Sequence, residues 1–277
     1  MAEALGYSRQ YFYKLSKEHA TLELTKQMVI DMVQKIRKQL PQLGTRKLHY
    51  MIKDELTSKQ IKVGRDKLFS WLKEYDMLIH PKKRYVQTTN SKHWMKKYPN
   101  LIKKYLITEP EQVWVSDITY IKTEEGNCYL NLITDACSRK IMGYAIADNM
   151  ETESMITALH MALKNKKDKL KSTIHHSDRG LQYCSALYVE TATKNNMIMS
   201  MTENGDPYEN ALAERMNRTM KDEFGLGEVI KNKEIAKILA KEAVILYNNQ
   251  RPHLSLQMKT PQQIHKKSRQ LEAVGII

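Results

Sequence analysis

Residues 113–136, VWVSDITYIKTEEGNCYLNLITDA, decide the fold class. Two runs rich in β-branched and aromatic residues flank the segment Glu124-Glu125-Gly126-Asn127, a pattern that predicts a β-hairpin. A third run of the same kind, KIMGYAIAD at 140–148, follows the hairpin. The three runs therefore predict the first strands of a sheet.

Helix and strand signals alternate after these strands. We expect a helix over Glu151–Lys164, a strand that runs into Asp178, a helix over Leu187–Lys194, the strand MIMSM at 197–201 and a long helix from about Tyr208. This alternation predicts an α/β domain of about 150 residues, a mixed sheet flanked by helices. We assign it to residues 111–277, including a C-terminal helical extension.

The segment up to residue 78 has the pattern of amphipathic helices, because apolar residues recur at spacings of three and four. Helices are expected over Leu24–Leu40, within GTRKLHYMIKDEL at 44–56 and within GRDKLFSWLKEYDMLI at 64–79. Residues 1–78 are therefore predicted to form a small all-α region.

An earlier helix is expected at the start of this region, in AEALGYSRQYFYKL. Gly6 suits the turn of a helix-turn-helix and Ser8 suits an N-cap, so the helix Arg9–Lys17 would enter the major groove. Its candidate contacts are Arg9, Gln10 and Lys14. A lone amphipathic helix that packs elsewhere on the protein fits these residues equally well.

Positive charge is concentrated at the front of the chain. The net charge is +14, and residues 1–110 hold 23 Lys and Arg against 10 Asp and Glu, whereas 111–277 hold 22 against 21. A charge this one-sided attracts polyanions, of which nucleic acid is the commonest. The composition therefore favours a nucleic-acid-binding protein, and residues 1–78 are assigned as its helical DNA-binding region.

Residues 79–110 are predicted to form a basic linker. Positions 81–104 contain eight Lys and Arg and no acid, interleaved with Tyr85, Trp94 and Tyr98. Such a segment can track phosphates and stack on bases, although a solvated tether has the same composition. The candidate DNA contacts in it are Lys82, Lys83, Arg84, Lys96 and Lys97.

The composition excludes several classes of protein. The N-terminus lacks a basic start followed by an apolar run, and no stretch is long enough to span a bilayer, so we expect a cytoplasmic protein without a membrane partner. Cys128, Cys137 and Cys184 are odd in number and far apart, which argues against a disulfide framework or a zinc site.

Three acidic residues lie at positions in the predicted strands and helices where catalytic residues are often found. Asp117 interrupts an apolar strand, Asp178 ends a later strand, and Glu214 lies on the following helix, with 35 residues between Asp178 and Glu214. A charge in a covered strand is costly unless it is paired or bound to metal. Ordinary explanations remain open: a turn at Asp178, and a solvated helix face made by Glu214, Arg218 and Lys221.

With these acids in view, the sequence resembles the DDE transposases of the retroviral-integrase superfamily, specifically the OrfB-type proteins of bacterial insertion sequences. The matching stretches are VWVSDITYI, HHSDRGLQY, NGDPYENALAERMNRTMKDE and YNNQRPHLSLQMKTP, in this order. LGTRKLHYMI and GRDKLFSWLKEYDML extend the resemblance upstream, so that it covers nearly the whole chain.

The resemblance implies an RNase H-like fold in which Asp117, Asp178 and Glu214 converge as catalytic metal ligands. Oxygen ligands suit Mg²⁺, with Mn²⁺ as the alternative, and two ions about 4 Å apart promote phosphodiester chemistry. By similarity, Asp117 contributes to both ions, and Asp178 and Glu214 each favour one. Lys221 matches a basic residue near the DNA ends, and Arg218 joins it as a candidate contact.

The resemblance also implies a function and partners: cleavage and strand transfer of an insertion sequence. The expected partners are the element's terminal repeats, target DNA, an upstream OrfA product or fusion, and further copies of the chain on DNA in the bacterial nucleoid. A retroviral His/Cys zinc module is absent, because residues 1–110 contain no cysteine. A non-catalytic DNA-binding regulator and an RNase H-like nuclease without strand transfer remain the alternatives.

Overall fold

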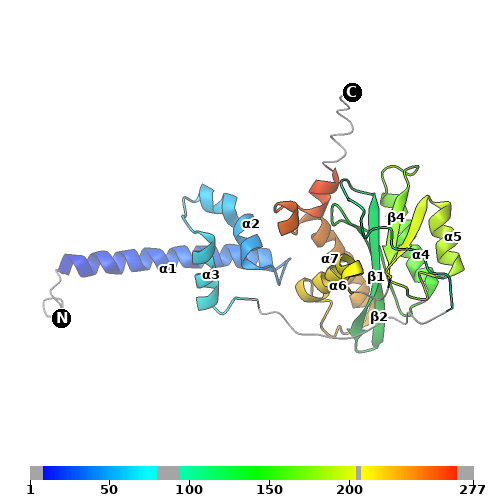
Figure 1. Ribbon diagram of the computed structural model, residues 1–277. Helices are drawn as coiled ribbons and strands as arrows, with labels where there is room; N and C mark the ends of the chain where they lie inside the picture. The colour runs from blue at the N-terminus through cyan, green and yellow to red at the C-terminus, as the bar shows by residue number, and fades with distance from the viewer. Residues whose placement is uncertain (1–8, 80–93, 204–206, 267–277) are drawn as a thin grey trace, which may run out of the picture. The chain divides into compact units, whose positions relative to one another are not determined.

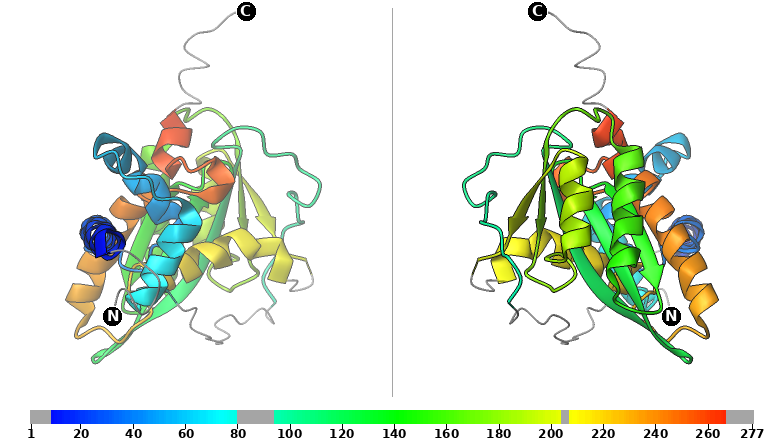
Figure 2. Two further views of the ribbon diagram at one scale, coloured as in Figure 1. Left: turned by 90° about the vertical axis from the view of Figure 1, so that its left-hand side faces the viewer. Right: turned by 90° about the vertical axis from the view of Figure 1, so that its right-hand side faces the viewer.

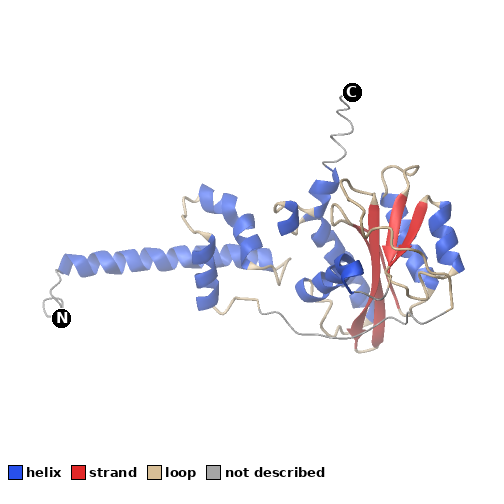
Figure 3. Ribbon diagram, in the orientation of Figure 1, coloured by secondary structure: helices blue, strands red, loops and turns tan. Residues whose placement is uncertain are grey.

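The computed structural model describes residues 9–79, 94–203 and 207–266. They form two compact units, which divide between His80 and Pro81. The first unit is helical, and every described strand belongs to the second (Figure 3). No helix within the described ranges is long and apolar enough to cross a bilayer.

The first unit consists of α1 (Arg9–Arg37), α2 (Thr45–Ser58) and α3 (Arg65–Glu74) (Figure 1). Gly44 and Gly64 are extended and stand at the N-caps of α2 and α3. The helices bury a small apolar core that includes Val29, Val33, Leu48, Ile52, Leu68 and Trp71. The predicted all-α region is confirmed.

The start of this unit differs from the sequence prediction. Two helices were expected, over Arg9–Lys17 and Leu24–Leu40, but α1 is continuous from Arg9 to Arg37. The intervening residues EHATLE contain neither Gly nor Pro, so nothing interrupts the backbone hydrogen bonds of the helix. Gly6 and Ser8, the expected turn and N-cap, lie outside the described residues.

The second unit contains one mixed five-stranded sheet. Its strands are β1 (Val113–Thr123), β2 (Gly126–Asp135), β3 (Ile141–Ala147), β4 (Thr173–Ser177) and β5 (Met197–Met201). Their order is β3-β2-β1-β4-β5, with antiparallel pairing in the β1-β2-β3 meander and parallel pairing of β4 with β1 and β5. The predicted hairpin and mixed sheet are confirmed.

Helices cover both faces of this sheet (Figure 2). α4 (Thr152–Asn165) and α5 (Ala186–Lys194) pack on one face, and α6 (Ala211–Glu223) and α7 (Lys233–Asn249) on the other. Short 3₁₀ turns, Pro207–Asn210 and Leu254–Leu256, precede α6 and follow α7. Side chains alternate along β1, so Trp114 joins the core under α4 and α5, whereas Val113 and Val115 join the core under α6.

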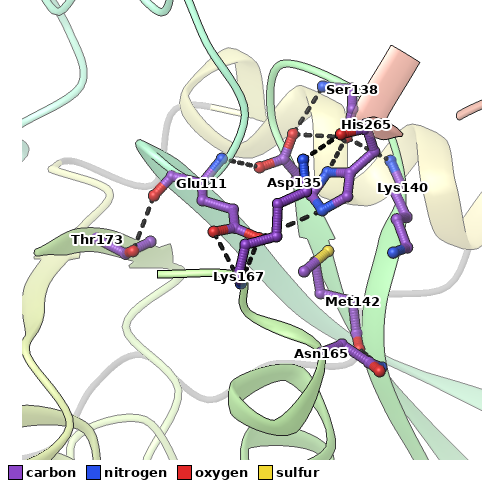
Figure 4. Close-up of polar contacts among 9 residues, drawn as sticks. All are labelled: Glu111, Asp135, Ser138, Lys140, Met142, Asn165, Lys167, Thr173 and His265. Atoms are coloured by element: carbon purple, nitrogen blue, oxygen red, sulfur yellow. Dashed lines mark hydrogen bonds and ion pairs between the residues drawn. The ribbon is translucent and has the colours of Figure 1, made fainter. Parts of the chain in front are cut away.

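A buried polar network fastens the end of the described chain to the sheet (Figure 4). The Asp135 carboxylate accepts hydrogen bonds from the backbone N–H groups of Glu111 (2.6 Å) and Ser138 (2.7 Å). His265, in the last described helical turn, lies 3.1 Å from the Ser138 hydroxyl and 3.3 Å from the Glu111 carboxylate. Burial alone would raise the pKa of Glu111, but hydrogen bonds from His265 and the Lys167 N–H hold this pKa below its ordinary value.

This network lies where β1 begins, at the end of the sheet opposite the carboxyl end of β4, because Trp114 pairs with Asp135 in the sheet register. The network anchors the C-terminal extension at this end of the sheet, and Asp178 lies at the opposite end.

Candidate active site

Asp117 and Asp178 lie on neighbouring parallel strands. The register pairs Val113 with Ile174 and Val115 with His176, and its continuation places Asp117 level with Asp178, directly after β4. The side chain of Asp117 points to the sheet face that α6 covers, because it alternates in step with Val113 and Val115. Glu214 lies in the first turn of α6. The fold thus gathers the three predicted acids from three elements.

The three acids interact through their charges. Burial raises the pKa of Asp117 to about 7, and the negative charges of Asp178 and Glu214 add to this rise. Burial also raises the pKa of Glu214, and Asp178 adds to it, whereas Arg218 opposes the shift. Mutual repulsion of this kind marks a site where added positive charge would be stabilising. As placed, no three His, Cys, Asp or Glu side chains of the described residues are arranged to hold a metal ion.

Asn217, which is not among the predicted site residues, orients Asp117. Its side-chain amide donates to Asp117 Oδ2 (2.9 Å), and the Ile118 backbone N–H donates to Asp117 Oδ1 (2.9 Å). Asn217 is buried on α6, three residues after Glu214, and its Oδ1 has no hydrogen-bond partner within the described part of the chain. Spacing of three on a helix is the signal that could have pointed to it.

Lys221 lies over the ring of Tyr120, 4.1 Å from the ring centroid. Tyr120 follows Asp117 by three residues on β1 and was not predicted as part of the site. The contact is a cation–π interaction, which holds an ammonium group at a fixed place beside the strand. Arg218 is exposed on the same helix, one turn after Glu214.

The two histidines before Asp178 have structural roles. His175 Nε2 lies 2.8 Å from the Tyr188 hydroxyl, and His176 bridges the Ser200 hydroxyl (2.9 Å) and the Glu209 carbonyl (3.1 Å). Burial lowers the pKa of each histidine to about 4, so both are neutral at physiological pH.

Two further contacts hold the surroundings of the acids in place. The Asn210 amide donates to the Ser116 carbonyl (3.2 Å), which ties the start of α6 to β1. The Gly180 backbone N–H donates to Asp178 Oδ1 (3.0 Å), so Asp178 does also build the turn that its sequence suggested. Arg251 is buried and paired with Glu223 through Nε (2.7 Å), which accounts for it as a packing residue.

Of the remaining predicted DNA contacts, some are described on one of the two units and the others fall outside the described residues. Arg9 begins α1, and Gln10 and Lys14 are exposed on it. Lys96 and Lys97 are exposed on the second unit. Lys82, Lys83 and Arg84 fall in residues 80–93, outside the described ranges.

The sheet order and the helices on both faces define an RNase H-like fold of the retroviral-integrase kind. An intasome structure of simian T-cell lymphotropic virus, in complex with the PP2A regulatory subunit B56 gamma, aligns with 80% of this chain and 74% of its own at a TM-score of 0.50. Its sequence identity to this chain is 18%, so the likeness concerns the fold alone.

Sequence comparisons define the family. Two family models, each described as an integrase core domain, match residues 107–207 and 195–261. The uncharacterized 31 kDa protein of insertion element IS600 from Shigella sonnei is 36% identical over 83% of this chain and 84% of its own. Transposase InsF of insertion sequence IS3A from Escherichia coli is 33% identical over 61% of this chain.

The chain belongs to the integrase-core transposases of bacterial insertion sequences, within the DDE superfamily that its sequence resembles. The match spans 59% of the InsF transposase and 55% of the IS629 transposase of Shigella sonnei, less than two thirds of either relative.

Proposed function

We propose that this chain is a metal-dependent polynucleotidyl transferase, which cleaves DNA at the ends of an insertion sequence and joins them to a target. The observation that carries the proposal is the cluster of Asp117, Asp178 and Glu214 on an integrase-core fold, in which burial and the charges of Asp178 and Glu214 raise the pKa of Asp117. A protein kept only for DNA binding would gain stability by losing these charges.

The donor set fits Mg²⁺ or Mn²⁺. Every candidate ligand is a carboxylate oxygen, and hard divalent cations prefer such oxygens. Without a cation, repulsion favours side-chain rotamers that keep the three carboxylates apart, which is consistent with the absence of a ready ligand cage among the described residues. Two bound ions would supply activation of the attacking oxygen and stabilisation of the leaving oxygen.

The residues around the acids have separate tasks in this proposal. Asp117 would contribute to holding both ions, and Asp178 and Glu214 would each contribute to holding one. Asn217 fixes the orientation of the Asp117 carboxylate through its hydrogen bond. Lys221 and Arg218, on the same helix as Glu214, contact the phosphates of the DNA end.

The wider DNA contacts belong to the rest of the chain. Exposed Gln10 and Lys14, with Arg9, would contact the terminal repeats from α1. Lys82, Lys83, Arg84, Lys96 and Lys97 would contact DNA phosphates from the predicted basic linker. Several copies of the chain on DNA, and an upstream OrfA product or fusion that supplies sequence discrimination, complete the proposed assembly in the bacterial nucleoid.

The test is a cleavage and joining assay with the full chain, a duplex that carries the element's terminal repeat, and plasmid target DNA. We expect cut ends and joined products with Mg²⁺ and neither with EDTA. Cut ends without joined products would identify a nuclease instead. Binding without either product in any divalent metal would identify a regulator.

A further inference from the structure

Residues 94–104, here called the basic strap, lie fixed against the edge strand β5. The Met201 backbone N–H donates to the Pro99 carbonyl (3.4 Å), and the Leu101 backbone N–H donates to the Ser200 hydroxyl (2.9 Å). Met95 and Tyr98 pack against the core under α4 and α5. This part of the predicted linker is therefore held on the second unit and does not hang free as a tether.

The strap passes the end of the sheet where Asp178 lies. β4 and β5 are parallel, with Ser177 level with Met201, so the strap contacts β5 at the level where β4 gives way to Asp178. The charges that act on Cys184 agree with a strap that lies close to Asp178. Burial and the charge of Asp178 raise the pKa of Cys184, in the turn after Asp178, while Lys97 and Arg179 oppose the shift.

The strap presents cations and an aromatic ring to solvent. Lys96, Lys97, Lys103 and Lys104 are all exposed, and Lys103 pairs with Glu203 at 3.5 Å. Trp94 is 91% exposed, whereas the other two tryptophans of the chain, Trp71 and Trp114, are 4% and 0% exposed. A tryptophan left in water beside fixed lysines matches the surfaces on which bases of single-stranded nucleic acid stack.

We propose that the basic strap binds single-stranded DNA, with Lys96 and Lys97 on its phosphates and Trp94 stacked on a base. This inference rests on the proposed function, because a strand cut at the three acids passes the strap as it leaves Asp178. A single strand is the occupant that the surface favours, since stacking on Trp94 requires a base that is free of its own helical stack.

Tryptophan fluorescence of the full chain tests the proposal, because Trp94 is the exposed one of three tryptophans. The chain is titrated in EDTA with a thymidine oligonucleotide, and with a duplex of equal charge. We expect the single strand to quench the emission more than the duplex does, and Trp94→Phe to remove the quenching. Equal quenching by the two DNAs, or quenching that survives in Trp94→Phe, would overturn the stacking contact.

The phosphate contacts are tested by the salt dependence of single-strand affinity, measured by fluorescence anisotropy of labelled DNA. Each lost contact lowers the slope of log affinity against log salt by about 0.7, so Lys96→Gln with Lys97→Gln should lower it by about 1.4. The control is Lys164→Gln with Lys194→Gln, two exposed lysines at the ends of α4 and α5 that lead to the amino ends of β4 and β5. Equal losses in both double variants would overturn the assignment.

These readouts separate the strap from the proposed function. If the chain binds single-stranded DNA through Trp94 but never cleaves DNA, the proposal for the strap stands and the proposed transferase activity is wrong. If the chain cleaves DNA normally but its strap variants bind DNA like the parent, the transferase activity stands and the proposal for the strap is wrong.

Discussion

Asp117 carries a charge that its surroundings oppose. Its pKa, raised to about 7 by burial and by Asp178, means that the folded chain binds this proton more tightly than the unfolded chain, in which the carboxyl has its ordinary pKa of 3.8. Stability is therefore lost as pH rises from about 4 to 7, while the Asp117 of the folded chain ionises. A buried carboxylate whose charge its surroundings oppose destabilises the fold that carries it.

We predict that Asp117→Asn stabilises the protein at pH 8 by about 1 to 2 kcal/mol in the absence of divalent metal, a usual gain when a costly site is neutralised. The Asn217 amide can reverse to accept from the new amide, because its Oδ1 has no partner in the described chain. Urea unfolding at pH 8 and at pH 4 measures the effect, which should disappear at the lower pH. A less stable variant at pH 8 would contradict the assignment of Asp117 as an uncompensated charge.

Tyr120 is predicted to position Lys221 for the DNA phosphate. Tyr120→Leu removes the ring face under the ammonium group, whereas Tyr120→Phe keeps it. A cation–π contact contributes about 0.5 to 1 kcal/mol, so we expect Tyr120→Leu to raise KM for DNA about 2- to 5-fold with little change in kcat. Cleavage kinetics over a range of DNA concentrations provide the measurement, and a Tyr120→Phe variant as impaired as Tyr120→Leu would rule out the ring as the cause.

Among the elements, those with a local signal are the ones that the sequence predicts. The strand VWVSDITYIKT coincides with β1, and MIMSM with β5, because β-branched, aromatic or apolar runs end at clear turns. The continuity of α1 through residues 18–23 was missed, because the first half of α1 is exposed and gaps in its apolar pattern resemble a helix boundary. Strand order depends on contacts between distant segments, and no local pattern encodes it.

In the candidate site, too, residues with a local sequence signal were predicted, and residues whose roles depend on long-range contacts were not. Asp117, Asp178 and Glu214 are predicted from their residue types, the order of their elements and the family resemblance. Asn217 and Tyr120 are polar and aromatic residues of ordinary kinds, and their roles come from side-chain contacts across 100 residues of sequence. The attachment of residues 94–104 to β5 could not be predicted either, because it rests on two long-range hydrogen bonds.

The packing of α4 on the sheet gives a prediction at this scale. A Cβ added at Gly143 on β3 would lie 2.1 Å from the Ala158 carbonyl oxygen and 2.6 Å from the Ala162 nitrogen, both backbone atoms of α4. We expect Gly143→Ala to destabilise the second unit by about 2 to 3 kcal/mol, since overpacking displaces rigid backbone. Gly44→Ala, where the added Cβ meets no atom within 4 Å, is the control for urea unfolding. Equal stability of the two variants would show that α4 is free to move away.

Over the whole molecule, more than half of the net positive charge lies in one stretch of the sequence. Residues 81–104 hold eight Lys and Arg without an acid, and the chain divides just before them, so this charge stays with the second unit. We predict that residues 81–277 alone keep more than half of the salt dependence with which the full chain binds DNA of random sequence. Affinity measured from low to high salt gives the slopes. A nearly flat slope for this fragment would transfer the phosphate contacts to residues 1–80.

The central claim is that three carboxylates hold the metal for DNA cleavage, and cleavage by charge-neutral variants tests it most directly. Asp117→Asn, Asp178→Asn and Glu214→Gln preserve shape but each removes a ligand charge, while Asp222→Asn neutralises an exposed acid on the same helix as Glu214. Because metal-ion catalysis contributes several kcal/mol, we predict that each of the first three cuts a terminal-repeat duplex in Mg²⁺ at least about 100-fold more slowly than the parent. DNA binding and cooperative unfolding should persist, and Asp222→Asn should cleave normally. Near-normal cleavage by Asp117→Asn, Asp178→Asn or Glu214→Gln would contradict the account.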